Sequence, residues 1–229
     1  MLVYPSGVDV FSSALRFLAA RLREHRRALG TRWRRLNAGR QALLTLAHLR
    51  NGQPYAQLAA GFGIGTTTAY RYITEAVNLL AALTEAVRAA SAKAYVILSG
   101  TLLPIDRIAD PKGRLMWVSP ALAGAVHDVR AAREHSIIEA LAEAGITCWA
   151  DKGYQGAGGT VRLPYRGRWG SLSTGQQAVN RSHAKIRALV EQAIATLKSW
   201  RLLRKLRCST TRITSLVQAV LVLQLAATG

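Results

Sequence analysis

The chain has 229 residues, of which 31 are Lys or Arg and only 12 are Asp or Glu, so its formal net charge at pH 7 is +19. The pI near 11.2 lies well above the value of about 9 that marks nucleic-acid-binding domains, and a polyanionic partner is the first inference. A chain of this length has room for two modules, and we expect two.

Cysteine and histidine spacing argues against a disulfide framework and a histidine-ligated metal. Cys148 and Cys208 form no Cys-x-x-Cys pair, and the five histidines show neither zinc-finger nor metalloprotease spacing. The N-terminus has no signal-peptide pattern, and the apolar run Leu216–Ala227 is shorter than the roughly 18 residues of a membrane span. We therefore expect a soluble, cytoplasmic protein.

The first 90 residues have helical periodicity. Ser12 or Ser13 is expected to cap a helix that runs to about Leu29 and ends at Gly30, with an apolar stripe on one side. Between residues 16 and 40, nine arginines accompany a single acid. Such a block is typical either of a solvated helix face or of a nucleic-acid-binding arm.

After a second helix over residues 37–50, residues 54–76 have the pattern of a helix-turn-helix. Three glycines permit a tight turn, Ile64 fills its corner, and Thr66 is expected to cap a helix that continues to about Ala90. Two helices joined by a glycine turn also occur in ordinary helical cores, but the net charge favours DNA contact. The side chains expected to contact a major groove or its phosphates are Thr66, Thr67, Thr68 and Arg71.

From Lys93 the hydrophobic pattern becomes strand-like. A buried strand is expected over residues 94–98, and residues 102–108 continue extended but bent by Pro104. The turn signal Asp110–Gly113 leads into a strand over residues 114–118, which makes a hairpin the natural local interpretation.

A helix from Asp128 to about Ala144, stopped by Gly145, precedes a short apolar run that ends in Asp151. Such a run is typical of a buried parallel strand, and function collects at the carboxyl ends of these strands. The sequence therefore predicts that Asp151 lies at a functional edge of a sheet.

Residues 155–175 are rich in glycine and arginine but lack the Gly-Lys-Ser/Thr ending of a phosphate-binding P-loop, so a mobile loop is expected. Trp169 is placed to stack on a base, and three arginines are expected to grip a nucleic-acid strand. These are Arg162, Arg166 and Arg168.

The last helical section starts near Gln176 and carries Glu191 beside its apolar face. A carboxylate there is costly unless it is paired or bound to a metal. Arg187 lies four residues earlier on the same side, so a purely structural ion pair is an alternative to a metal site.

Two signatures in this order of elements resemble the DDE transposases of bacterial insertion sequences, in particular the insertion-sequence-5-like group. One is Asp151-Lys-Gly-Tyr at a strand end, and the other is Arg187, three spacers, Glu191, six spacers and Lys198. Ala184 stands where the family's second signature has a tyrosine. Val126-His-Asp-Val129 and Val179-Asn-Arg-Ser-His183 also look like family motifs.

The resemblance implies an α/β protein with a helical helix-turn-helix module over residues 1–90 and a ribonuclease-H-like mixed sheet with flanking helices over residues 91–229. In this family three carboxylates hold two divalent metals, Mg²⁺ or Mn²⁺, and Asp151 and Glu191 are the second and third carboxylates. Lys152, Lys198 and Arg187 bind or orient phosphate.

The implied reaction is hydrolytic nicking of the element ends, followed by attack of the freed 3′-hydroxyl on target DNA. The implied partners are double-stranded DNA of the element ends and target, and further copies of the chain in a homo-oligomer on DNA. The implied location is the bacterial nucleoid.

The chain departs from the family at the first carboxylate, because Ser99 stands at that position. Asp106 is the nearest substitute, but seven residues along a strand place it on the opposite face unless a bulge or Pro104 reverses the alternation. Asp128 is a second candidate. The link between Ile108 and Arg114 is shorter than in the family, so the sheet lacks one strand or rebuilds it from residues 102–110.

Three hypotheses follow. The chain is a DDE transposase, active or impaired; a DNA-binding regulator with a catalytically dead domain; or a general nucleic-acid-coating protein. We predict DNA binding with weak or no cleavage.

Overall fold

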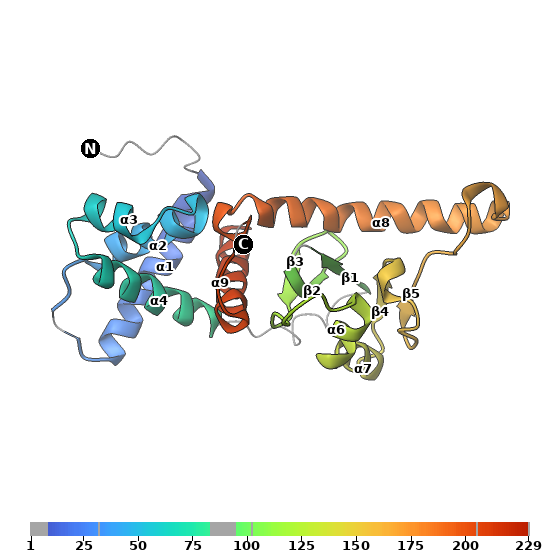
Figure 1. The fold of residues 1–229 in the computed structure, drawn as a ribbon, viewed down its shortest axis with the longest axis horizontal. Helices are drawn as coiled ribbons and strands as arrows, with labels where there is room; N and C mark the ends of the chain where they lie inside the picture. Colours follow the sequence, from blue (N-terminus) through green and yellow to red (C-terminus); the bar gives the residue numbers. More distant parts are fainter. Residues whose placement is uncertain (1–8, 32, 83–94, 102, 205, 229) are drawn as a thin grey trace. The chain divides into compact units, whose positions relative to one another are not determined.

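The computed structural model describes residues 9–31, 33–82, 95–101, 103–204 and 206–228. Its backbone forms two compact units, one of residues 1–84 together with 197–229 and one of residues 85–196. The first unit is helical and the second contains a mixed sheet, as the sequence predicts (Figure 1).

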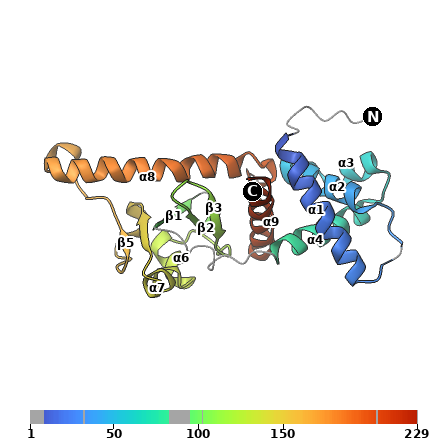
Figure 2. The same ribbon diagram turned by 180° about the vertical axis from the view of Figure 1, so that it is seen from behind.

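The helical unit packs four N-terminal helices with the C-terminal helix. These are α1 (Asp9–Ala28), α2 (Ala38–Asn51), α3 (Tyr55–Phe62), α4 (Thr66–Ala81) and α9 (Thr210–Thr228). Helix α1 contacts α2, α4 and α9, and α9 also packs along α4 (Figure 2). The sequence predicted a sheet domain over residues 91–229, which would include residues 197–229. In the structure, residues 197–229 belong to the helical unit instead.

Helix α9 contains a stretch, Thr210–Ala227, that is long and apolar enough to cross a membrane, with a mean hydropathy of 1.3. Its apolar side chains, including Val217, Val220 and Leu223, are buried where α9 packs against α4 and α1. A core helix passes the same length and composition test, and we interpret α9 as one.

Two predicted helix caps are wrong. Helix α1 extends from Asp9 to Ala28, so Ser12 and Ser13 lie inside the helix. The N-cap of α4 is Gly65, whose carbonyl accepts the first helical hydrogen bond, and Thr66 is the first helical residue. Asn37, where the second helix was predicted to begin, is the N-cap of α2, and its side chain accepts the amide N–H of Arg40. The predicted extension of α4 to residue 90 lies outside the described residues.

A half-buried carboxylate, Glu75, ties α4 to α2. Arg34 donates two hydrogen bonds to Glu75, at 2.8 and 2.9 Å, and Gln41 donates one to Glu75 and one to the carbonyl of Tyr72. Burial alone would raise the pKa of Glu75, but the bonds from Arg34 and Gln41 outweigh it and hold that pKa below its usual value. This network fastens α4 to α2 and to the segment that precedes α2.

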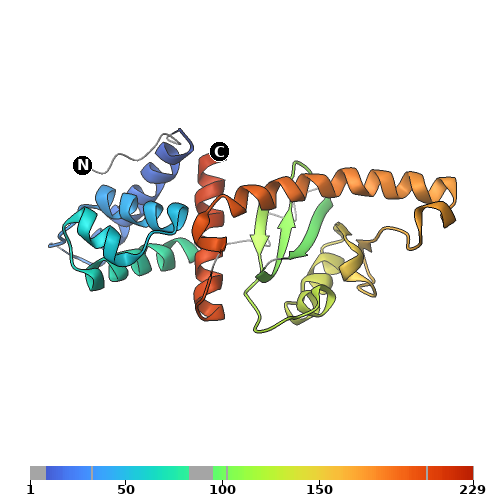
Figure 3. The same cartoon turned by 45° about the horizontal axis from the view of Figure 1, so that its top comes forward.

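The second unit contains a five-stranded sheet in the order β3-β2-β1-β4-β5 (Figure 3). The strands are β1 (Tyr95–Thr101), β2 (Leu103–Ala109), β3 (Leu115–Val118), β4 (Thr147–Ala150) and β5 (Val161–Arg162). Strand β1 pairs antiparallel with β2 and parallel with β4. The sequence left two alternatives for the short link between Ile108 and Arg114, a missing strand or a strand rebuilt from residues 102–110. The rebuilt strand is confirmed, because residues 103–109 form β2.

Helices lie on both faces of the sheet. The short helices α6 (Asp128–Glu134) and α7 (Ile137–Glu143) bury their apolar residues against Val96, Leu98 and Cys148 on one face. The single helix predicted here is wrong, because Ser136 has a φ of +51° and breaks it in two. The long helix α8 (Thr174–Lys198) runs along the other face (Figures 1 and 3).

The turn between β2 and β3 approaches α8 closely. Asp110 holds the turn by accepting the amide N–H groups of Lys112 and Arg114, both at 2.9 Å. Gly113 has a φ of +75°, and a Cβ at this position would lie 2.6 Å from the carbonyl oxygen of Leu189. Glycine is therefore required both for the backbone conformation and for the contact with α8.

We predict that Gly113→Ala destabilises the sheet unit by roughly 2–4 kcal/mol, because it combines backbone strain with a clash against helix backbone. Gly124→Ala is the matched control, since Gly124 has a φ of +77° but nothing within 4 Å of an added Cβ. It should cost only about 1 kcal/mol. Thermal unfolding of the two variants checks this, and equal losses would contradict the role of the contact.

Candidate active site

Ser99 and Asp151 lie side by side at the carboxyl ends of two parallel strands. Leu98 pairs with Ala150 in the β1–β4 register, so the next residues are Ser99 on β1 and Asp151 after β4. Both lie on the opposite face from the buried Leu98 and Ala150, because side chains alternate along a strand. This is the face along which α8 runs. The edge predicted from the apolar run before Asp151 is therefore present.

Asp151 is held by its own loop and by α8. Its Oδ1 accepts the amide N–H of Gly153 at 2.8 Å and caps the short 3-10 helix η1 (Lys152–Tyr154). Its Oδ2 lies 3.5 Å from a guanidinium nitrogen of Arg187. The same nitrogen lies 3.8 Å from Oε1 of Glu191, one helical turn further along α8. Arg187 therefore links both carboxylates.

The sequence left a purely structural ion pair between Arg187 and Glu191 as an alternative to a metal site. This ion pair is present but weak. The Glu191 side chain is 62% exposed, and ion pairs of this kind contribute little to stability. The packing of α8 therefore does not depend on Glu191, whose carboxylate faces solvent on the side of α8 that carries Arg187.

Asp128 lies at the start of α6 and meets Asp151 across Gly153. A Cβ on Gly153 would lie 2.5 Å from Oδ2 of Asp128 and 2.9 Å from Oδ1 of Asp151. Burial, and then repulsion from the Asp151 carboxylate, raise the pKa of Asp128 above its ordinary value. Gly153 is thus needed because two carboxylates pack against it, a role that the sequence pattern did not reveal.

Asp106, the other candidate substitute, is turned away from Ser99. In the antiparallel register Ser99 pairs with Arg107, whereas Asp106 pairs with Gly100 and so shares the face covered by α6 and α7. Its side chain is 1% exposed and accepts a hydrogen bond from the Tyr154 hydroxyl at 2.7 Å. Asp106 is therefore a core carboxylate.

Charge around these carboxylates is balanced by a buried arginine. Arg107 is 2% exposed, and its burial lowers the pKa of the guanidinium while Tyr154, Asp106, Asp128 and Glu191 act in the opposite direction. Arg107 was not singled out from the sequence, because a basic residue in a strand gives no hint that it faces inward.

The donor chemistry suits a divalent cation only in part. Asp128 and Asp151 supply two hard oxygen donors at one point, and a cation there would relieve their repulsion. Within the described residues, however, no three His, Cys, Asp or Glu side chains converge closely enough to hold a metal ion. Glu191 is connected to the pair through Arg187 instead.

Two lysines of the predicted site are exposed. Lys152 follows Asp151 directly, within η1. Lys198 lies seven residues after Glu191 on α8, which is about two helical turns along the same side.

The helix-turn-helix side chains expected to contact DNA are accessible. Thr66, Thr67 and Arg71 are exposed in the first turns of α4 and Thr68 is half-buried, whereas Tyr72 faces the core. This separation of faces is the one that the hydrophobic pattern predicts.

The three loop arginines are exposed, and α8 anchors the loop that carries them. Asn180 forms two hydrogen bonds with the backbone of Tyr165, and His183 donates to the carbonyl of Arg162. Both anchors belong to the motif Val179–His183. The predicted mobile loop contains β5 and a 3-10 turn, η2 (Trp169–Ser171), and Arg181 lies 5.2 Å from the ring centre of Trp169.

Comparisons with known proteins identify the family of the chain. Residues 103–224 match a family model described as DDE superfamily endonuclease, and residues 34–86 match one described as helix-turn-helix of DDE superfamily endonuclease. The chain is 32% identical over 189 residues to a Streptomyces albus G protein described as "Putative transposase for insertion sequence element IS112", covering 73% of this chain and 71% of that protein. No solved structure matches the chain significantly.

We predict that Gly153→Ala weakens divalent metal binding, because the added methyl group displaces the carboxylates of Asp128 and Asp151. The measurement is the rise in melting temperature produced by Mn²⁺. Gly170→Ala is the control, since Gly170 is also the central residue of a 3-10 turn but has nothing within 4 Å of an added Cβ. Equal Mn²⁺ effects in both variants would contradict the prediction.

We predict that Asp106→Asn stabilises the chain at neutral pH. Burial raises the pKa of Asp106 from 3.8 to about 6, although the Tyr154 bond opposes this. The folded chain therefore favours the protonated carboxyl, and stability falls as pH rises from about 4 to about 6, by roughly 3 kcal/mol in total. The amide cannot ionise, so the gain in melting temperature should vanish below about pH 4.

Asp110→Asn is the control, and it should change stability at neutral pH in the opposite direction. Burial opposes ionisation of Asp110, but hydrogen bonds from Arg114 and Lys112 outweigh it and lower its pKa. Its charged form is stabilising above its ordinary pKa, so this variant should lose stability at neutral pH. A stabilising Asp110→Asn, or a destabilising Asp106→Asn, would contradict the assignment.

Proposed function

Because the chain belongs to the DDE transposases of insertion sequences, we propose that it binds the ends of its own element and cuts them at the edge formed by Asp151 and Asp128. The enzyme class follows from the family, and the residues and DNA partner are our assignment. In this assignment the helical unit recognises DNA and the sheet unit carries the nuclease site. The DNA is that of a bacterial nucleoid, in the cytoplasm.

The observation that carries the proposal is the convergence of Asp128 and Asp151 on Gly153, with Glu191 connected through Arg187. Asp151 and Asp128 would hold the divalent cation, Mg²⁺ or Mn²⁺, and Glu191 would join them as the third ligand once Arg187 binds a phosphate instead. When bound, such a cation stabilises the attacking and leaving oxygens of a displacement at phosphorus. Asp128 then supplies a carboxylate that Ser99 lacks.

The basic residues of the site bind the DNA backbone. Arg187 lies between the carboxylates and has a planar fork that suits a phosphodiester. Lys152, directly after Asp151, and Lys198, further along the exposed side of α8, bind phosphates on either side of the cut. These cations orient the scissile phosphate over the carboxylates.

Recognition of the DNA uses two further groups of side chains. Helix α4 enters the major groove or contacts its flanking phosphates through exposed residues of its first turns, Thr66, Thr67, Thr68 and Arg71. The anchored loop grips the strand near the cut with Arg162, Arg166 and Arg168.

Cleavage is followed by attack of the freed 3′-hydroxyl on target DNA. Joining two element ends to one target requires two nuclease sites, so we propose that the chain forms a homo-oligomer on DNA.

Ser99 is the residue of the site that does not suit cation binding. In the register it stands beside Asp151 and opposite the buried Arg107, where a carboxylate would be neutralised by the guanidinium. A serine hydroxyl carries no charge and is a poor ligand for a hard cation. We therefore propose that cleavage is impaired, and the second candidate function is a DNA-binding regulator whose nuclease domain is catalytically dead.

We predict that Ser99→Asp increases metal-dependent nicking of a duplex taken from the DNA flanking the chain's own gene. The added carboxylate supplies a cation ligand beside Asp151 and a partner for Arg107. The measurement is strand nicking with Mg²⁺ or Mn²⁺, compared with the rise in melting temperature that each metal produces.

Ser99→Asn controls for size and polarity, because the amide has nearly the same shape without the charge. It should leave nicking and metal stabilisation at the level of the unmodified chain. Robust cutting by the unmodified chain would refute the impairment. DNA binding without cutting in any variant would favour the regulator.

A further inference from the structure

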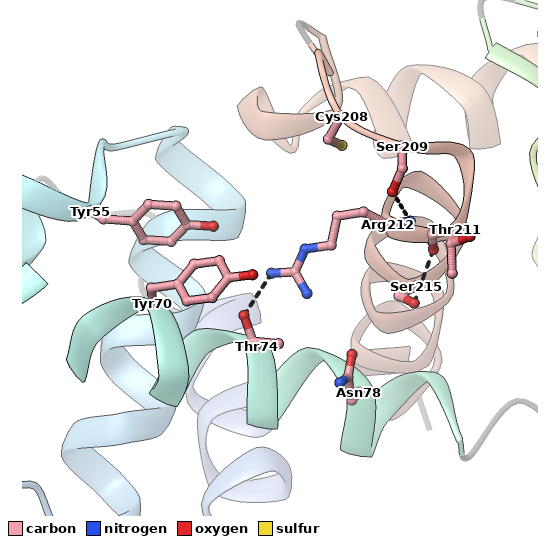
Figure 4. Close-up of a pocket in the computed structure, with 9 residues that line it drawn as sticks. All are labelled: Tyr55, Tyr70, Thr74, Asn78, Cys208, Ser209, Thr211, Arg212 and Ser215. Atoms are coloured by element: carbon pink, nitrogen blue, oxygen red, sulfur yellow. Dashed lines mark hydrogen bonds between the residues drawn. The ribbon is translucent and has the colours of Figure 1, made fainter. Parts of the chain in front are cut away.

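The helical unit contains a groove, lined by polar and aromatic residues, that the proposed function does not use. It has a volume of about 500 Å³ and lies between α3 and α4 on one side and the start of α9 on the other (Figure 4). Its lining residues are Tyr55, Tyr70, Thr74, Asn78, Cys208, Ser209, Thr211, Arg212 and Ser215. None of these is acidic, and they comprise one cation, two phenols, an amide, a thiol and four hydroxyl groups.

Arg212 gives the groove its charge. It is half-buried in the first turn of α9, and its guanidinium donates a hydrogen bond to the hydroxyl of Thr74 at 3.3 Å (Figure 4). A cation is unfavourable in the first turn of a helix, because the free amide groups there already carry partial positive charge. An anion in the groove would compensate both the charge of the Arg212 guanidinium and the partial positive charge of the free amide groups.

The tyrosines form the opposite wall. The rings of Tyr55 and Tyr70 meet edge to face at 5.4 Å, and His48 stacks on Tyr55 at 4.7 Å. Tyr70 remains 47% exposed, so an apolar ring face and a hydroxyl are open to a ligand. Such a wall suits a sugar next to a phosphate better than a bare inorganic anion.

The groove continues a face of the expected DNA-contacting helix. Thr66, Tyr70, Thr74 and Asn78 are spaced four residues apart along α4 and therefore lie on one side of it. Thr66 is one of the residues expected to contact DNA, and the other three line the groove. A DNA strand that follows this side of α4 reaches Arg212.

We propose that this groove binds a backbone phosphate, with its sugar, of the DNA that α4 contacts. Arg212 and the hydroxyl groups of Ser209 and Thr211 receive the phosphate, and Tyr70 packs against the sugar. The proposal rests on the proposed DNA binding and adds α9 to the DNA-contacting surface, beyond the helix-turn-helix.

Cys208 allows occupation of the groove to be measured directly in the full chain. It is an exposed free thiol that lines the groove, whereas burial raises the pKa of the only other cysteine, Cys148, to about 12. Since the thiolate is the reactive form, alkylation reports on Cys208 alone. A saturating duplex from the DNA flanking the chain's gene should protect Cys208 in the unmodified chain.

Arg212→Gln is compared with Arg23→Gln, which removes the same charge from an exposed position on α1 outside the groove. Arg212→Gln should weaken duplex binding about tenfold and reduce the slope of log affinity against log salt by about one. At saturating duplex, Cys208 should stay protected in Arg23→Gln and become reactive in Arg212→Gln.

The outcomes separate the two proposals. A chain that does not bind duplex at all refutes the proposed function and this inference together. A chain that binds duplex while Cys208 stays reactive refutes only the inference, and this result needs no variant to fold. Equal protection of Cys208 in both variants also overturns it. Protection by inorganic phosphate or a free deoxynucleotide, as strong as that by duplex, overturns DNA as the ligand.

Discussion

The packing of two carboxylates against Gly153 is the constraint on which the candidate site depends. Asp128 comes from the start of α6 and Asp151 from the end of β4, and only a residue without a side chain allows both to lie there. The contact therefore ties a helix on one face of the sheet to the carboxyl end of a central strand. It also places two like charges together, a cost that a bound cation would remove.

Two arginines with different surroundings supply positive charge near the carboxylates of Asp128 and Asp151. Arg187 reaches Asp151 and Glu191 from α8 and is partly exposed, so it can exchange its carboxylate partners for a phosphate. Arg107 is buried in β2 on the same side as Ser99, which stands where the family resemblance places the first carboxylate. The site is thus rich in positive charge at the point where the family resemblance places a metal ligand, and this is the physical basis of the impaired cleavage that we propose.

The rebuilt strand shows how the sheet tolerates the short link. Residues 103–109 pair with β1 on one side and β3 on the other, so the sheet keeps its order although the connection to β3 is only a turn. One consequence is the position of Asp106. Pairing of β1 and β2 sets Asp106 opposite Gly100, facing Tyr154 in the core, and so turns it away from Ser99.

Much of this was determined by the sequence alone. Hydrophobic periodicity and glycine positions identified the helix-turn-helix, the apolar strand ending in Asp151 and the long helix with Arg187 and Glu191, because these are local patterns of burial and backbone freedom. The break at Ser136 was missed, since no glycine or proline marks it. Only the tertiary structure decided that Asp128 rather than Asp106 meets Asp151, that Arg107 faces inward and that α9 joins the N-terminal helices. Each depends on strand register or on contacts between segments far apart in the chain, which no local pattern encodes.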